Sequence, residues 1–260
     1  MRRSTRITTL AAGTAAAAAL VVTGLAVGHT PTRAAAHEPR KTGVVVAHGA
    51  DRHPSQTATD WVTYADHVVE VTPVDERDIP PSQEEVDRGE GVILRGVTLR
   101  VDKVLWTRSG ATQAAPASFD WTAYGWQFTD GDVHNRTEMA GEGQPRIETG
   151  HHYVMALEWE APRCVPGDGE LPGRWRGLGS ESIIPYDNGV LGEGEFQGRP
   201  LQLKAARATA LDPGDPDYSL RDEFTGHTAA ELADRLTGTA PGQKTQRSLR
   251  QADAPAEECS

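Results

Sequence analysis

The residues best suited to chemistry in this chain are two adjacent histidines and one acid. His151 and His152 open an apolar segment, and Glu181 follows in a glycine-rich stretch. Imidazole and carboxylate groups together can perform general acid–base hydrolysis. Neighbouring residues at the start of a strand point to opposite faces, however, which favours a structural or surface role for the two histidines. Glu181, His151 and His152 are the residues of a hydrolase hypothesis.

Other motifs carry less chemical information. Ser180 lies in Gly177-Leu178-Gly179-Ser180-Glu181-Ser182, which lacks the last glycine of a nucleophile elbow, and nothing nominates a base for it. The acidic stretch 212–217 contains two prolines that break the pattern of a calcium loop. His48 and His53 fall in an irregular segment that fixes no ligand geometry. We therefore expect no catalytic residue, no cofactor and no metal site.

A tryptophan between two arginines is the best candidate for a contact with a partner. Trp175 is flanked by Arg174 and Arg176 in a segment rich in glycine and proline. Tryptophan and arginine are enriched in binding hot spots. Two interpretations stay open: the indole is exposed for a partner, or it packs over the core.

The chain has two cysteines, Cys164 and Cys259. In an oxidising compartment an even number of cysteines indicates one disulfide. The alternative is two unpaired thiols, with Cys259 able to link two chains.

The N-terminal segment indicates export. Arg2, Arg3 and Arg6 precede an almost uncharged run from Leu10 to Val27, and Ala34-Ala35-Ala36 follows as a cleavage motif. This order is typical of a signal peptide cleaved after Ala36, and it predicts an extracellular protein. The apolar run approaches the length that spans a bilayer, so an uncleaved membrane anchor is the alternative.

The net charge limits the class of partner. The full chain has a formal charge of −11, and removal of the four arginines of residues 1–36 lowers it to −15. An acidic surface repels nucleic acid and anionic lipid, and it favours solubility. We expect no nucleic-acid partner and, after cleavage, no membrane contact.

Hydrophobic patterning predicts short strands and two helices. A capped helix is expected near residues 60–65 and a second after Thr228, ending at Gly238. Strands are expected at 66–72, at 91–106 with a bulge after Lys103, at 119–128 with a kink near Gly125, at 153–159 and near 201–205. Turns are expected at 130–131 and 187–189, and irregular polar segments at 75–90 and 134–150.

These elements predict one folded domain with flexible ends. The expected organisation is a signal peptide at 1–36, a disordered linker at 37–58, a single β-rich domain at 59–237 and a flexible tail at 238–260. The strands do not alternate with helices as βαβ units require. The fold class is therefore mainly β, or β-rich α+β, with a short N-terminal helix and one C-terminal helix.

Three packing motifs add a resemblance. They are Ala65-Asp66-His67-Val68-Val69, Val97-Thr98-Leu99-Arg100-Val101-Asp102-Lys103-Val104-Leu105 and Gly150-His151-His152-Tyr153-Val154-Met155-Ala156-Leu157. Over residues 60–195 the chain resembles exported proteins of unknown function from high-GC Gram-positive (actinobacterial) bacteria. The resemblance implies a small antiparallel OB-like barrel, and it carries over no active-site residue.

Two function hypotheses follow. The preferred one is an exported, non-enzymatic binding module whose partner is a protein or an envelope component. The alternative is a secreted hydrolase with an unrecognised active site. A pocket that gathers Glu181, His151 and His152 would favour the hydrolase.

Overall fold

The computed structural model describes residues 43–165 and 169–244. The predicted signal peptide and Cys259 lie outside these residues. None of the described helices combines the length and apolarity that a bilayer crossing requires.

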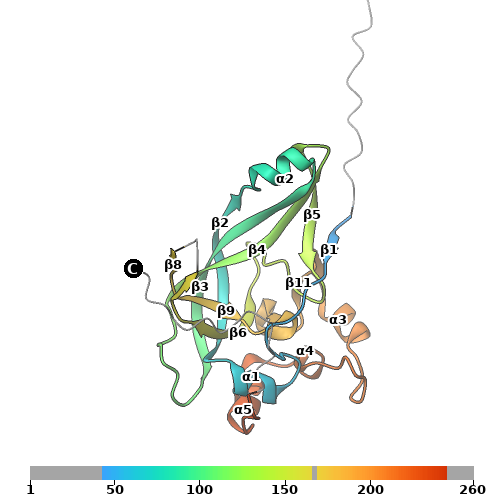
Figure 1. The fold of residues 1–260 in the computed structure, drawn as a ribbon. Coiled ribbons are helices and arrows are strands. Elements are labelled where there is room, and N and C mark those ends of the chain that lie inside the picture. Colours follow the sequence, from blue (N-terminus) through green and yellow to red (C-terminus); the bar gives the residue numbers. More distant parts are fainter. Residues whose placement is uncertain (1–42, 166–168, 245–260) are drawn as a thin grey trace, which may run out of the picture. The chain divides into compact units, whose positions relative to one another are not determined.

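One large mixed sheet organises the described residues (Figure 1). Four consecutive strands form an antiparallel meander: β2 (His67–Ile79), β3 (Gly91–Thr107), β4 (Ser118–Thr129) and β5 (Asp132–Gly141). Strand β6 (Tyr153–Glu160) pairs with the other edge of β2, and β1 (Val45–Ala47) lies parallel to β5. The far edge of β6 is shared by β9 (Arg174–Gly177) and β10 (Ile183–Pro185). The prediction of a mainly β fold is confirmed.

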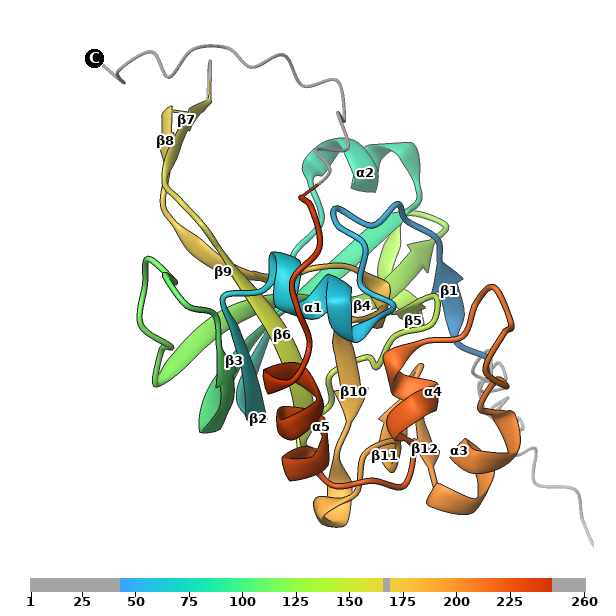
Figure 2. The same cartoon turned by 90° about the horizontal axis from the view of Figure 1, so that it is seen from below.

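Two apolar cores cover the two faces of this sheet. Helices α1 (Ala58–Tyr64), α4 (Leu220–Phe224) and α5 (Ala229–Thr237) pack on one face and meet Val154 and Ala156 of β6 (Figure 2). The curl of the sheet encloses the other core, which contains Tyr153, Met155 and Leu157. Residues 153–157 of β6 are buried on both faces, because the helices cover Val154 and Ala156, whereas Glu158, Trp159 and Glu160 are half-buried.

The predicted irregularities of β3 and β4 are present. Val68 pairs with Trp106 and Val69 with Val104, so one residue of β3 is left over in a bulge at 105. On β4, Gly125 is the extra residue opposite Ile93 and Leu94. A Cβ at Gly125 would lie 2.5 Å from the Ile93 carbonyl oxygen, so only glycine allows this close approach.

The expected OB-like closed barrel is not found among the described strands. Their hydrogen-bonded path runs from β1 to β10, and no pairing joins its ends. Instead, β4 and β9 approach each other through side chains, and a Cβ at Gly177 would come within 3.0 Å of the Trp121 ring. Periodicity predicts which residues form strands and which faces they bury, but not which edges pair. We call this contact, between β9 and the part of β4 that does not pair with β5, the seam.

Some segments that were predicted to be irregular form hydrogen bonds from their backbone amides to residues elsewhere in the fold. Within the expected linker, β1 forms and the His53 amide donates to the Leu178 carbonyl. Within the expected tail, the Gly242 amide donates to Thr63 Oγ1 at 2.7 Å. Tertiary hydrogen bonds thus hold parts of both segments, and an apolar pattern along the sequence does not reveal such bonds.

Two polar segments also form regular structure. The stretch 75–90 contains the end of β2 and the helix α2 (Gln83–Arg88), whose N-terminus is capped by Ser82 and Glu85. The helix buries no residue, so it has no apolar periodicity to detect. The first part of the stretch 134–150 is the end of β5, a strand between β4 and β1 that buries only its last two residues.

The remaining elements are short. They are the strand pair β7 (Arg163–Val165) and β8 (Gly169–Leu171), the strand pair β11 (Gly194–Phe196) and β12 (Arg199–Leu201), the helix α3 (Leu203–Thr209), and the 3₁₀ turns at Ser180–Ser182 and Asp187–Gly189. The strand expected near 201–205 is therefore the end of β12 followed by a helix. The two predicted helices are confirmed; Thr57 caps α1 and Thr228 caps α5.

Candidate functional site

At the end of β6, the carboxylate of Glu160 contacts the side chains of four arginines. Glu160 accepts from Arg174 Nε at 2.8 Å, from Arg176 Nη1 at 3.2 Å and from Arg52 Nη1 at 3.2 Å. The Nε of Arg163 lies 3.9 Å from the same carboxylate. These arginines come from β9, β7 and the segment before α1, and we call them the arginine cluster.

Strand pairing explains how the cluster forms. Residues Glu158-Trp159-Glu160 of β6 run antiparallel to Arg174-Trp175-Arg176 of β9, with Glu160 opposite Arg174 and Trp159 opposite Trp175. Successive side chains of a strand point to opposite faces. The acids and arginines therefore share one face, and the two tryptophans share the other. Cross-strand pairs of opposite charge stabilise this register.

Trp175 is part of the core rather than an exposed contact. Only 8% of its surface is accessible. Its ring centroid lies 5.2 Å from that of Trp159 and 5.3 Å from the His67 ring. The packing interpretation of Trp175 is confirmed, and the exposed one is wrong because the strand alternation turns this indole inward. Arg174 and Arg176 face outward on either side of it.

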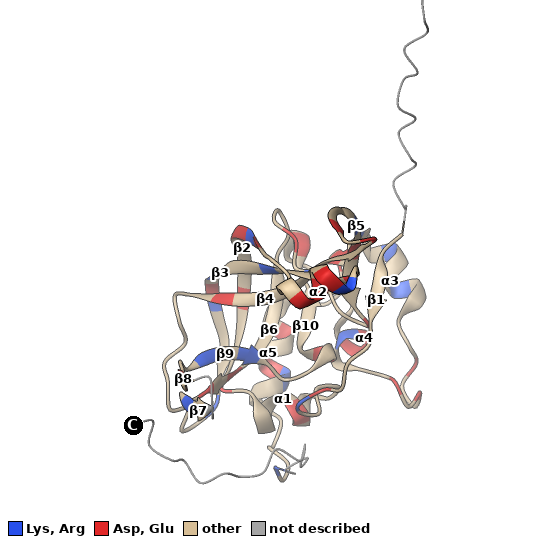
Figure 3. Ribbon diagram, turned by 45° about the horizontal axis from the view of Figure 1, so that its top comes forward, with Lys and Arg blue, Asp and Glu red and all other residues tan. Residues whose placement is uncertain are grey.

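The cluster has an excess of positive charge. Burial of the Glu160 carboxyl acts to raise its pKa, but hydrogen bonds from Arg174 and Arg176 and the charges of Arg176 and Arg52 outweigh this effect and lower the pKa to about 2. The second acid, Glu158, lies 3.9 Å from Arg52 and 3.1 Å from His53. Four guanidinium groups thus face two carboxylates, in a chain whose net charge is negative. The blue segments of β9 in Figure 3 mark this region.

A cleft at the seam adjoins the cluster. It has a volume of about 260 Å³ and lies between β4 and β9. Arg52, Arg174 and Arg176 line one part of it, and Asp120 and Trp121 of β4 line another. The seam therefore combines a hollow, an aromatic side chain and several guanidinium groups, which are the features of an interaction surface.

The residues of the hydrolase hypothesis are not brought together. His151 Nδ1 lies 2.5 Å from Asp187 Oδ2, and the His152 amide donates to Asp187 Oδ1. His151 is half-buried and His152 is exposed, as their position at the start of β6 predicted. Glu181 instead lies 3.6 Å from Arg221, and neither histidine lines its cavity.

Glu181 opens on a second polar hollow of about 510 Å³. Burial raises the pKa of Glu181, while the Arg221 charge acts against this effect. Ser180 donates to Asp51 Oδ2 at 2.9 Å, so its hydroxyl is bonded to a carboxylate rather than to an imidazole. None of the described residues that line this hollow is a histidine, so the partner of the Ser180 hydroxyl differs from that of a Ser-His-Asp triad.

The disulfide between Cys164 and Cys259 stays a prediction. Cys164 lies in β7 and is exposed, whereas Cys259 lies outside the described residues. Over residues 43–165 and 169–244, no group of three or more His, Cys, Asp or Glu side chains is arranged to hold a metal ion.

Comparison with known proteins adds no relative. No family model, no curated protein and no solved structure matches this chain. The similarity to actinobacterial exported proteins therefore stays a prediction.

Sequence reasoning named Arg174 and Arg176 but missed Arg52, Arg163 and Glu160. A signal for the acid was present, because Glu158-Trp159-Glu160 and Arg174-Trp175-Arg176 are complementary tripeptides. Two such segments joined by a turn-rich connection predict antiparallel pairing. Arg52 lies more than a hundred positions before Glu160, and no local pattern relates the two.

Proposed function

We propose that this protein is an exported, non-enzymatic binding module that recognises an acidic partner through the arginine cluster. The observation that carries the proposal is the convergence of four guanidinium groups on Glu160 beside the seam. The partner is a protein or an envelope component that presents several carboxylates or phosphates.

The cluster keeps donors for such a partner. Each guanidinium has five N–H donors in a planar fork that matches a carboxylate or a phosphate. Glu160 has only two oxygens to share among four arginines, and the side chains of Arg163 and Arg174 are 45% and 54% exposed. Because Glu160 already orients these side chains, less conformational entropy is lost when a partner binds.

The acidity of the whole chain supports selectivity. Long-range repulsion from this chain weakens the binding of every polyanion, so the affinity depends on close contacts at the cluster. We expect the affinity for an acidic partner to fall as salt increases.

The binding test compares charge-matched variants. Poly-L-glutamate and inorganic polyphosphate serve as carboxylate and phosphate probes in calorimetric titrations at low salt. The double variant Arg174→Gln/Arg176→Gln should bind the better probe about tenfold or more weakly, because charge-assisted hydrogen bonds are lost. The control Arg100→Gln/Arg235→Gln removes the same charge from two other exposed ion pairs and should stay within about twofold of wild type. Equal losses in both variants, or no binding by wild type, would contradict the proposal.

Export has its own test. Mass spectrometry of the protein from the culture medium should show an N-terminus at His37. An intact Met1 terminus in the membrane fraction would support the anchored alternative instead.

The hydrolase alternative is tested by activity. Ester, glycoside and peptide substrates are incubated with wild type and with Glu181→Gln. Turnover that is lost in this variant would replace the binding proposal with the hydrolase one.

A further inference from the structure

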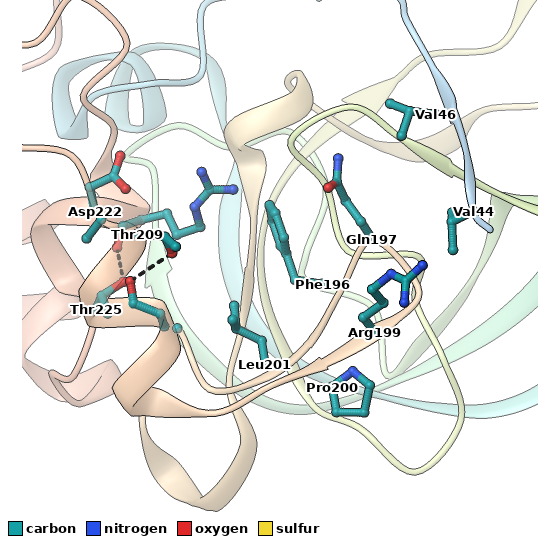
Figure 4. Close-up of a pocket in the computed structure, with 14 residues that line it drawn as sticks. Val44, Val46, Phe196, Gln197, Arg199, Pro200, Leu201, Thr209, Asp222 and Thr225 are labelled. Atoms are coloured by element: carbon teal, nitrogen blue, oxygen red, sulfur yellow. Dashed lines mark hydrogen bonds between the residues drawn. The ribbon is translucent and has the colours of Figure 1, made fainter. Parts of the chain in front are cut away.

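A cavity of about 480 Å³ lies away from β9, between β1, the β11–β12 pair, α3 and α4 (Figure 4). A volume of this order is typical of sites for small molecules. Val44, just before β1, and Val46 of β1 form one wall, and Phe196, Leu201 and Ala206 form much of the rest. Val46 is one of four large apolar side chains that are exposed in the described residues.

Most polar groups of this cavity are already engaged. Asp222 accepts from the Ser219 amide and hydroxyl and from the Leu211 amide, because it caps α4. The hydroxyl of Thr209 donates to carbonyl oxygens of its own helix, and that of Thr225 to the Arg221 carbonyl oxygen. These groups offer little to a ligand. In Figure 4 they lie together on one side of the cavity, opposite Arg199 and the two valines.

Two cations belong to the lining, and Arg221 is the more engaged of them, because its Nη1 donates to the Gly143 carbonyl oxygen at 2.9 Å. The guanidinium of Arg221 lies 4.5 Å above the Phe196 ring and is partly balanced by Glu181 at 3.6 Å. Arg199 is exposed at the rim, and within the described residues its side chain makes no ion pair or hydrogen bond. The cavity thus combines an apolar wall with an unpaired guanidinium at its edge.

We propose that this cavity binds a small amphipathic anion, a monocarboxylate with a short apolar chain or ring. The apolar part packs against Phe196, Leu201 and the two valines, where it leaves water. The carboxylate pairs with Arg199, with Arg221 as the second cation of the lining. This site is separate from the arginine cluster, so neither proposal depends on the other.

The experiment uses three probes of equal chain length on the full chain: octanoate, octan-1-ol and octylammonium. Calorimetry or NMR titration should show octanoate binding at least about tenfold more tightly than octylammonium, because only the anion pairs with Arg199. Octan-1-ol should bind between the two. Equal binding of all three probes, or no octanoate binding below its micelle concentration, would overturn the proposal.

Variants locate the site. Arg199→Gln should weaken octanoate about fivefold or more and leave octan-1-ol unchanged, because only the charged contact is lost. Val46→Glu should weaken both probes, since it places a charge on the apolar wall. Both substituted residues are at least partly exposed, so the fold should be retained.

Matched controls exclude nonspecific effects. Arg100→Gln removes an exposed arginine elsewhere, and Val104→Glu changes an exposed valine on β3. Neither should alter octanoate binding, and Arg174→Gln/Arg176→Gln should also retain it. If the controls weaken octanoate binding equally, octanoate binds through net charge or at scattered surface sites, and the proposed cavity site is rejected.

Discussion

Two groups of arginines in this molecule have opposite environments. Arg95 and Arg146 are 1% and 5% exposed, whereas Arg163 and Arg174 of the arginine cluster have about half of their side chains in solvent. Both groups pair with acids. They differ in which groups accept hydrogen bonds from the remaining N–H donors of the arginines.

The interior arginines bond mainly to backbone. Arg95 donates to the carbonyl oxygens of Tyr124, Arg146 and Ile147, and also to Glu76. Arg146 donates to the carbonyl oxygens of Gly125 and Met139 and pairs with Glu148. These bonds connect the segment around 146–148 to β4 and β5.

Glu195 completes this buried network. Its oxygens accept from the amides of Arg146, Ile147 and Gly198 and from the Tyr153 hydroxyl, which lies 2.8 Å away. A buried charge with this many donors is compensated within the fold. The interior arginines donate to backbone carbonyl oxygens and so stabilise the fold. The arginines of the cluster share one carboxylate, which leaves N–H donors free to bind a partner.

The largest expected effect is the loss of Glu195. The substitution Glu195→Ala leaves buried amides and a buried hydroxyl without an acceptor, so the free energy of unfolding should fall by about 3–5 kcal/mol. Urea denaturation measures it. Glu193→Ala, a less buried neighbour, should change the free energy by less than about 1 kcal/mol. A small effect at Glu195 would mean that the network does not hold the segment around 146–148.

Removal of one hydroxyl should have an intermediate effect. Tyr153→Phe keeps the ring but deletes the group that donates to Glu195 and accepts from the Glu148 amide at 2.9 Å. We expect a loss of about 1–3 kcal/mol in the free energy of unfolding. Burial and the charge of Glu195 raise the pKa of Tyr153 far above its usual value near 10. In an ultraviolet titration this phenol should stay protonated while the chain is folded, and its ionisation with exposed tyrosines would argue against the bond.

The arginine cluster should matter less for stability. Glu160→Gln should lower the free energy of unfolding by about 1 kcal/mol or less at pH 7, because the arginines of the cluster are partly solvated. The pKa of Glu160 is depressed from 4.5 to about 2, so its contribution is fully present above about pH 4.5 and is lost as pH falls through about 2. Urea denaturation at pH 7 and pH 2.5 should show the difference between wild type and variant shrinking. A difference that grows on acidification would contradict the ion pairs.

The sequence predicts features that depend on neighbouring residues, but not contacts between residues far apart in the chain. Helix α5 follows from Thr228 and Glu231, and the bulge of β4 follows from Gly125, because each is a local pattern. Glu195 lies in Gly194-Glu195-Phe196-Gln197-Gly198, which has the composition of an exposed turn. It is buried because amides some fifty positions earlier in the chain need its oxygens. The arginine cluster was half predictable, since Arg174 and Arg176 are local and Arg52 is not.

The smallest expected effect on the folded domain concerns the predicted disulfide between Cys164 and Cys259. Loop-closure entropy gives about 4–5 kcal/mol for a loop of roughly a hundred residues, but this value applies only where both ends belong to the cooperative fold. Cys164 lies in β7, which pairs with β8 and contributes no residue to either core. We therefore expect Cys164→Ser to lower the free energy of unfolding by less than about 1 kcal/mol.

Thiol labelling of the secreted protein under denaturing, non-reducing conditions tests the bond itself. Two labelled cysteines per chain would reject it, and a disulfide-linked dimer would show that Cys259 pairs between chains. A large loss of stability in Cys164→Ser would instead place the C-terminal segment within the cooperative fold.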